Sequence, residues 1–360
     1  MRSVGVVVAG RGIVLALLFF LLPLSCGFGA GLDETRWFDC ATPKSCILRA
    51  RILEDRFRSS ASRVGKVEIY RAGAILSRLL AMYIRGREDV PSFLELNDIY
   101  TKEISDDLAM LVKAMLELVL GRGVKAGEIL KGVTCTARCD ISKQVISSLV
   151  EIERGDLSYV SSHLKDSPDP ISLVYARHLL DRGGCRESSK IFQRLLKRSG
   201  GDVDVVADWA RSLLDCGKPK RNMHSMLYKA LGAEPASLYL RSQLVRFLVD
   251  EGRLDEAAKV IGGADVPSTP GRGGSLFMTE VAAYNVRLGK REEAISLLRQ
   301  ALSAWHENVR ALRLLGRIYL VERSDWELGA AYLRAYTDLA IYATDRPRLL
   351  LLLEELGDPR

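Results

Sequence analysis

Apolar residues recur at helical spacing along most of the chain, and short turns that contain glycine interrupt them at regular intervals. After Gly289, for example, Ala294, Leu297, Leu298 and Ala301 follow at positions i, i+3, i+4 and i+7. This spacing places their side chains on one face of a helix. Glycine suits the end of the preceding helix, because its backbone adopts the left-handed conformation without steric cost. The pattern therefore predicts pairs of helices joined by tight turns.

One eight-residue pattern occurs three times, at 176–183, 210–217 and 245–252, with an arginine in second place and a glycine at the end. The three glycines lie 34 and 35 residues apart, and further glycines extend the series in both directions. The full series is Gly86, Gly121, Gly155, Gly183, Gly217, Gly252 and Gly289. A single unit of this size cannot bury its apolar face, so neighbouring units stack. The sequence therefore predicts an all-α solenoid of stacked helix-turn-helix repeats.

The repeats resemble those of the tetratricopeptide repeat family. The family's small residue at repeat position 8 and alanine at position 20 have counterparts in Ala176, Ala210, Ala282 and Gly316, and in Ala126, Ala257 and Ala294. The family's aromatic residue at position 4 is absent. The resemblance implies a right-handed α-solenoid, in which the first helix of each repeat lines a concave groove that binds a protein or peptide.

These patterns divide the chain into five expected parts. They are a signal peptide at 1–27, an N-terminal helical segment with a cysteine-rich loop at 28–66, degenerate helical repeats at 67–170, repeats that resemble the family at 171–343, and a C-terminal capping helix and tail at 344–360. Prolines and glycines between Ala264 and Ser275 predict a loop inserted between two repeats.

The first 27 residues have the layout of a secretory signal. Arg2 and Arg11 precede the uncharged apolar run 12–24, which is shorter than the roughly 20 residues that a membrane-spanning helix needs. We therefore expect export to the periplasm or to the periplasmic face of a membrane.

The end of this signal resembles the lipobox of bacterial lipoproteins, in which Cys26 would be acylated. Pro23 stands where that family prefers an aliphatic residue, so cleavage after Gly27 or Gly29 competes with lipidation. We expect membrane attachment only through a lipid at Cys26 or through an uncleaved signal.

Six of the seven cysteines follow the signal, an even number that suits an oxidising compartment. Two pairs flank short segments, and we expect a disulfide in each, with buried free thiols as the alternative. They are Cys40 with Cys46 and Cys135 with Cys139. Cys185 and Cys216 lie near the turns of neighbouring repeats. The sequence is compatible with a disulfide between them or with two free thiols. The spacing does not fit a zinc site, so we expect no metal ion.

Arginines occupy equivalent positions in successive repeats. Counted in the family's register, position 9 is Arg177, Arg211, Arg246, Ala283 and Arg317, and position 13 is Asp181, Asp215 and Asp250 in the first three. In one interpretation the guanidinium groups bind carboxylates or carbonyls of an extended peptide. In the other, each arginine pairs with the aspartate one turn later on its own helix.

The last of these repeats differs, because Val321 replaces the acid one turn after Arg317. Arg310 and Arg313 lie on the same helix, which predicts the strongest unpaired positive surface there. The candidate partner-binding residues on the concave face are Arg177, Arg211, Arg246, Arg310, Arg313 and Arg317.

Composition narrows the function further. Hydrophobic residues at 48% and charged residues at 27% are typical of a folded soluble protein, and the net charge of +7 is dispersed, so we expect no nucleic-acid partner. The four histidines are scattered without a nucleophile motif, and the glycine-containing segment 121–126 follows a helix rather than a strand, so we expect no catalysis, nucleotide or other cofactor.

The sequence thus predicts a non-catalytic scaffold or adaptor of the bacterial cell envelope that binds a protein or peptide segment. Two alternatives stay open. One is a recruiting or regulatory subunit of an envelope enzyme or assembly complex, and the other is a self-assembling structural lipoprotein.

Overall fold

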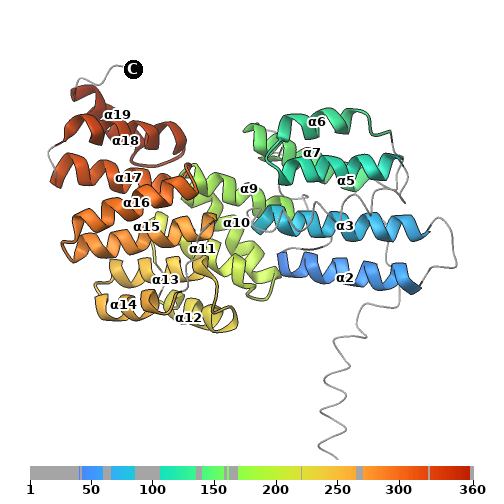
Figure 1. Ribbon diagram of the computed structural model, residues 1–360, viewed down its shortest axis with the longest axis horizontal. Helices are drawn as coiled ribbons and strands as arrows, with labels where there is room; N and C mark the ends of the chain where they lie inside the picture. The colour runs from blue at the N-terminus through green and yellow to red at the C-terminus, as the bar shows by residue number, and fades with distance from the viewer. Residues whose placement is uncertain are drawn as a thin grey trace, which may run out of the picture.

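The computed structural model describes residues 40, 43–59, 66–85, 106–134, 140–157, 160–161, 169–219, 221–264, 271–322 and 325–356. Over these residues the protein is built from sixteen α-helices and one π-helical turn, without a strand (Figure 1). The predicted all-α solenoid of helix-turn-helix repeats is confirmed.

Five helices form the N-terminal part of the array. They are α2 (Pro43–Ser59), α3 (Lys66–Arg85), α5 (Asp106–Val119), α6 (Gly123–Lys131) and α7 (Asp140–Arg154). In Figure 1 they lie on one side of α9 (Asp169–Asp181) and α10 (Cys185–Arg198), and the remaining helices lie on the other.

The C-terminal part continues as alternating inner and outer helices. The inner helices are α11 (Val203–Asp215), α13 (Leu238–Asp250), α15 (Arg272–Arg287) and α17 (Val309–Arg317), and the outer ones are α12 (Met223–Ala233), α14 (Leu254–Gly262), α16 (Arg291–Ala304) and α18 (Trp326–Leu339). Helix α17 runs into the π-helical turn η2 (Ile318–Glu322), and α19 (Arg346–Glu355) closes the array.

The predicted turn glycines form the helix ends. All those of the series that lie in the described residues have positive φ, from 63° at Gly217 to 84° at Gly183. After Gly217 the backbone N–H of Lys218 donates to the Leu213 carbonyl at 2.9 Å, which satisfies a carbonyl at the end of α11. A side chain with a Cβ would strain this conformation, so glycine sets the point at which α9, α11, α13 and α15 end.

Side-chain caps begin several of the helices that follow. Asp202 accepts a hydrogen bond from the Asp204 amide at the start of α11, and Asn308 accepts one from the Ala311 amide at the start of α17. A cap of this kind stabilises a helix by about 1 kcal/mol. Polar residues therefore help to fix where these two helices start.

The core runs along the array rather than filling a single centre. Fully buried side chains include Leu111, Ile146, Leu173 and Phe192, which lie on α5, α7, α9 and α10. The small residues of the repeat pattern bring the helices close. A Cβ on Gly316 would lie 2.7 Å from Leu333 of α18, so α17 and α18 touch at this glycine.

The loop predicted between Ala264 and Ser275 is shorter than expected, because α15 already begins at Arg272. The expectation was wrong for Gly273 and Ser275, which are helical. The Ser275 hydroxyl is buried and donates to the Ala301 carbonyl at 2.7 Å, and Gly273 lies against Tyr239. These small residues serve close packing between helices, which a sequence pattern for loops does not distinguish from a turn.

Among the described residues, none of the helices combines the length and apolar character needed to cross a bilayer.

Candidate binding site

The inner helices of the C-terminal repeats surround a cavity of about 620 Å³. Its wall comes from the end of α9, from α11, α13, α15 and α17, and from residues after α18. Apolar side chains such as Val249, Val286 and Leu314 line it. The charged lining residues are Arg211, Arg246, Arg287, Arg310, Arg313 and Arg317, with Asp215, Asp250 and Asp345. The cavity thus combines apolar surface with an excess of positive charge.

Most of the arginine ladder is paired between repeats. Arg211 of α11 donates to Asp181 at the end of α9 at 2.8 Å, and Arg246 of α13 donates to Asp215 of α11 at 2.5 Å. The contacts within one helix are longer, 3.7 Å from Arg211 to Asp215 and 3.9 Å from Arg246 to Asp250. The arginines therefore join neighbouring repeats, and the expected pairing along one helix is only a secondary contact.

These ion pairs keep the acidic groups ionised. Burial alone would raise the pKa of Asp215, but Arg246 and Arg211 outweigh it and hold that pKa below its ordinary value. For Asp181 the burial effect is likewise outweighed, here by Arg272 and Arg211, and its pKa is lowered. The carboxylates that face these arginines are therefore charged at neutral pH.

Arg177 does not line the cavity. Its side chain is 10% exposed, its Nε atom donates to Asp208 at 2.6 Å, and its Nη1 atom donates to the Ile84 carbonyl. Asp208 also accepts a hydrogen bond from the Tyr239 hydroxyl at 2.6 Å. The structure thus gives Arg177 a buried contact between α3, α9 and α11, where a partner does not reach it.

Two arginines of the last repeat form ion pairs that the sequence does not predict. Arg310 donates to both oxygens of Glu280, at 2.5 and 2.8 Å, and Arg313 lies 2.6 Å from Asp345 with its guanidinium over the Tyr336 ring. The expectation that Arg310 and Arg313 are unpaired is therefore wrong, because α15 and the segment before α19 supply acids that lie far from them in the sequence.

Two arginines of the lining have no ion pair or hydrogen bond among the described residues. They are Arg317, which the sequence predicts to be unpaired, and Arg287, which the sequence analysis does not single out. Both are exposed. Arg287 is the last residue of α15, where a cation is favoured by the helix dipole, and Arg317 stands where α17 passes into η2. The signal for Arg287 was present in the sequence, because it occupies position 13, at which the three preceding repeats carry Asp181, Asp215 and Asp250.

A short segment between α18 and α19, residues 340–345, closes the array on itself. We call it the closing loop. The Tyr342 amide donates to the Arg182 carbonyl at 2.8 Å, and Ala343 lies against Gly183, at whose position a Cβ would come within 2.7 Å. The Tyr336 hydroxyl donates to Asp345 at 2.8 Å. The end of the array therefore contacts the turn after α9, and the cavity is bounded on this side.

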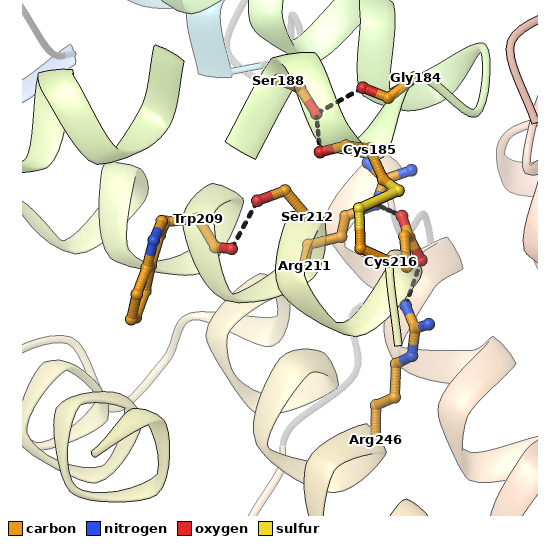
Figure 2. Close-up of a disulfide and its surroundings, with 9 residues drawn as sticks. Gly184, Cys185, Ser188, Trp209, Arg211, Ser212, Cys216 and Arg246 are labelled. Carbon is orange, nitrogen blue, oxygen red and sulfur yellow. Dashed lines mark hydrogen bonds and ion pairs between the residues drawn. A yellow bond between two sulfur atoms is a disulfide. The ribbon is translucent and has the colours of Figure 1, made fainter. Parts of the chain in front are cut away.

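A disulfide between Cys185 and Cys216 lies in the cavity wall. It joins the first residue of α10 to the residue after α11, with 5.5 Å between the two Cα atoms. Figure 2 shows it beside Arg211 of α11 and Arg246 of α13. Trp209, which is also on α11, points away from it. The sequence is compatible with either a disulfide or free thiols at these two cysteines, and the structure shows the disulfide.

The other cysteine predictions have mixed outcomes. The expected Cys40–Cys46 disulfide is present, with 4.9 Å between the Cα atoms, and it joins Cys40, which precedes α2, to the first turn of that helix. Cys26, Cys135 and Cys139 lie outside the described residues. In the described part of the chain, no cluster of histidine, cysteine and acidic side chains is arranged to hold a metal ion.

No family model matches the chain, and no curated protein matches it. Among solved structures, the chain is similar to one described as "Crystal structure of APC/C hetero-tetramer Cut9-Hcn1". The two share 13% identity and a TM-score of 0.38 over 97% of this chain and 85% of that chain. With identity and TM-score this low, the fold assignment rests on the order of helices and turns described above.

Proposed function

We propose that the protein is a non-catalytic scaffold that binds a segment of a partner protein in the arginine-lined cavity. The observation that carries this proposal is the contrast within the cavity. Four of its six arginines pair with acids of the chain, whereas Arg287 and Arg317 face it without such a partner. Unpaired cations beside apolar surface are typical of recognition sites, because a guanidinium without an acid of its own chain gains most when a partner supplies the counter-charge.

The place of action is part of the same proposal. The secretory layout of residues 1–27 and the disulfides Cys40–Cys46 and Cys185–Cys216 support a protein of the bacterial cell envelope, since disulfides persist in oxidising compartments.

Intact-mass spectrometry of the native protein tests export. We expect a mature chain that lacks the signal, and alkylation only after reduction of its disulfides. A start at Cys26 with a lipid mass would place the scaffold on a membrane, and a start near Phe28 or Ala30 would make it free in the periplasm. A chain that still begins at Met1, with thiols that alkylate without reduction, would contradict the proposal.

Site-specific photo-crosslinking in the native cells tests binding. A benzoylphenylalanine at Leu314 in the cavity is expected to form a crosslink to a second protein. The matched control is Lys229 on the outer helix α12, which is exposed and does not line the cavity. It is expected not to give the same product.

Two outcomes would contradict cavity binding, namely no crosslink from Leu314 or the same product from both positions. A product of two copies of this chain would instead favour the self-assembling structural protein.

A further inference from the structure

The proposed function does not specify the chemistry of the bound segment. The charged residues of the cavity indicate which kind of segment it binds. We infer that the segment is acidic, and that its carboxylates bind Arg287 and Arg317. This inference rests on the proposed function and concerns the same cavity.

Arg287 and Arg317 end the neighbouring inner helices α15 and α17. Both side chains are exposed and line the cavity, and Arg317 stands directly before η2. A π-helical turn inside a helix often marks a functional site. The two guanidinium groups therefore belong to one wall and present several N–H donors to whatever enters.

The acids of the cavity do not neutralise this pair. Asp215 accepts from Arg246 and also lies near Arg211, and Asp345 is held by Arg313. Asp250 is the remaining carboxylate of the lining, and its ion pair in the described chain is the 3.9 Å contact with Arg246. The excess of positive charge is therefore concentrated at Arg287 and Arg317, and a neutral or basic segment would leave it uncompensated.

The closing loop shows how the cavity takes a carboxylate. One oxygen of Asp345 lies 2.6 Å from Arg313, and the other accepts a hydrogen bond from the Tyr336 hydroxyl at 2.8 Å. The Arg313 guanidinium also lies over the Tyr336 ring, 5.9 Å from its centroid. An acid from the same chain thus already binds an arginine one helical turn before Arg317.

The apolar lining adds a second requirement. Val286 precedes Arg287, and Leu314 and Ile318 flank Arg317 on the same wall. A segment in which acidic residues alternate with apolar ones matches both features. With about 620 Å³ and the closing loop as a boundary, the cavity fits a short segment.

Fluorescence anisotropy with two labelled peptides tests this inference on the purified mature chain. One peptide has the pattern Glu-Leu-Glu-Ala-Glu-Leu-Glu, and the other carries glutamine in place of each glutamate. The glutamate peptide is expected to bind, with an affinity that falls as salt is added, and the glutamine peptide is expected to bind about tenfold more weakly or worse.

Charge reversals locate the site. Arg287→Glu and Arg317→Glu are each expected to weaken binding of the glutamate peptide by about tenfold. Lys229→Glu, which makes the same change of net charge on the outer helix α12, is expected to leave it unchanged. Because all three side chains are exposed, each change should lower the free energy of unfolding by less than about 1 kcal/mol, so the variants stay folded. Equal binding of both peptides, or equal binding by the two cavity variants and wild type, would overturn the inference.

The crosslink from Leu314 separates this inference from the proposed function. An acidic partner segment predicts that the crosslink is lost in the Arg287→Glu and Arg317→Glu backgrounds and kept in Lys229→Glu. If the crosslink forms in all of them, the cavity binds a partner but the partner segment is not acidic. If the wild type forms none, the proposed function itself fails.

Discussion

Replacement of Asp208 by alanine is expected to lower the free energy of unfolding by about 3–5 kcal/mol, because it leaves a buried charge without its partner. The Asp208 side chain is buried, and it accepts hydrogen bonds from Arg177 and from the Tyr239 hydroxyl, each at 2.6 Å. The guanidinium of Arg177 reaches the Ile84 carbonyl as well. Removing the carboxylate therefore strands a cation where α3, α9 and α11 meet.

Urea unfolding followed by far-UV circular dichroism measures this effect. Asp250→Ala is the matched control, because this carboxylate is half exposed and lies 3.9 Å from Arg246, so its removal should cost less than about 1 kcal/mol. The double variant Arg177→Met, Asp208→Leu should recover part of the loss, since it leaves no buried charge. A loss in Asp208→Ala no larger than that in Asp250→Ala would show that the pair does not hold the repeats together.

The fold could be predicted from local features because each repeat carries its own signals. Glycines such as Gly183, Gly217 and Gly252 end helices through their own backbone conformation. The alanines of the pattern are buried because their small side chains let neighbouring helices pack closely. Stacking then follows from the need to cover an apolar face. None of these signals depends on how strongly the array curves.

The partners of the arginines depend on that curvature and could not be predicted. Helical spacing relates Arg211 to Asp215 on the same helix, but the shorter contact joins Arg211 to Asp181 of the preceding repeat. The contact of Arg313 with Asp345 requires the closing loop to return to the inner face, which no local pattern indicates. Arg287 is different, because comparison of the repeats at position 13 alone would have revealed the reversal of charge.

Loss of the Cys185–Cys216 disulfide is expected to destabilise the protein by about 3–4 kcal/mol in the chain-entropy description of a cross-link. The two cysteines are 31 residues apart, and the bond ties the start of α10 to the end of α11. Asp215, which precedes Cys216, accepts from Arg246 and lies near Arg211. We therefore expect its loss to loosen the cavity wall as well as to lower stability.

The double variant Cys185→Ser, Cys216→Ser, unfolded in urea without reductant, measures this cost. Cys40→Ser, Cys46→Ser is the control, because its cysteines are only six residues apart and the same description gives roughly 2 kcal/mol. Dithiothreitol should lower the stability of the wild type by more than it lowers that of Cys185→Ser, Cys216→Ser, because that variant no longer has the longer cross-link to lose. If Cys185→Ser, Cys216→Ser were as stable as the oxidised wild type, the bond would not connect the repeats in the folded protein, and the wall of the cavity would depend on the ion pairs of Asp215 alone.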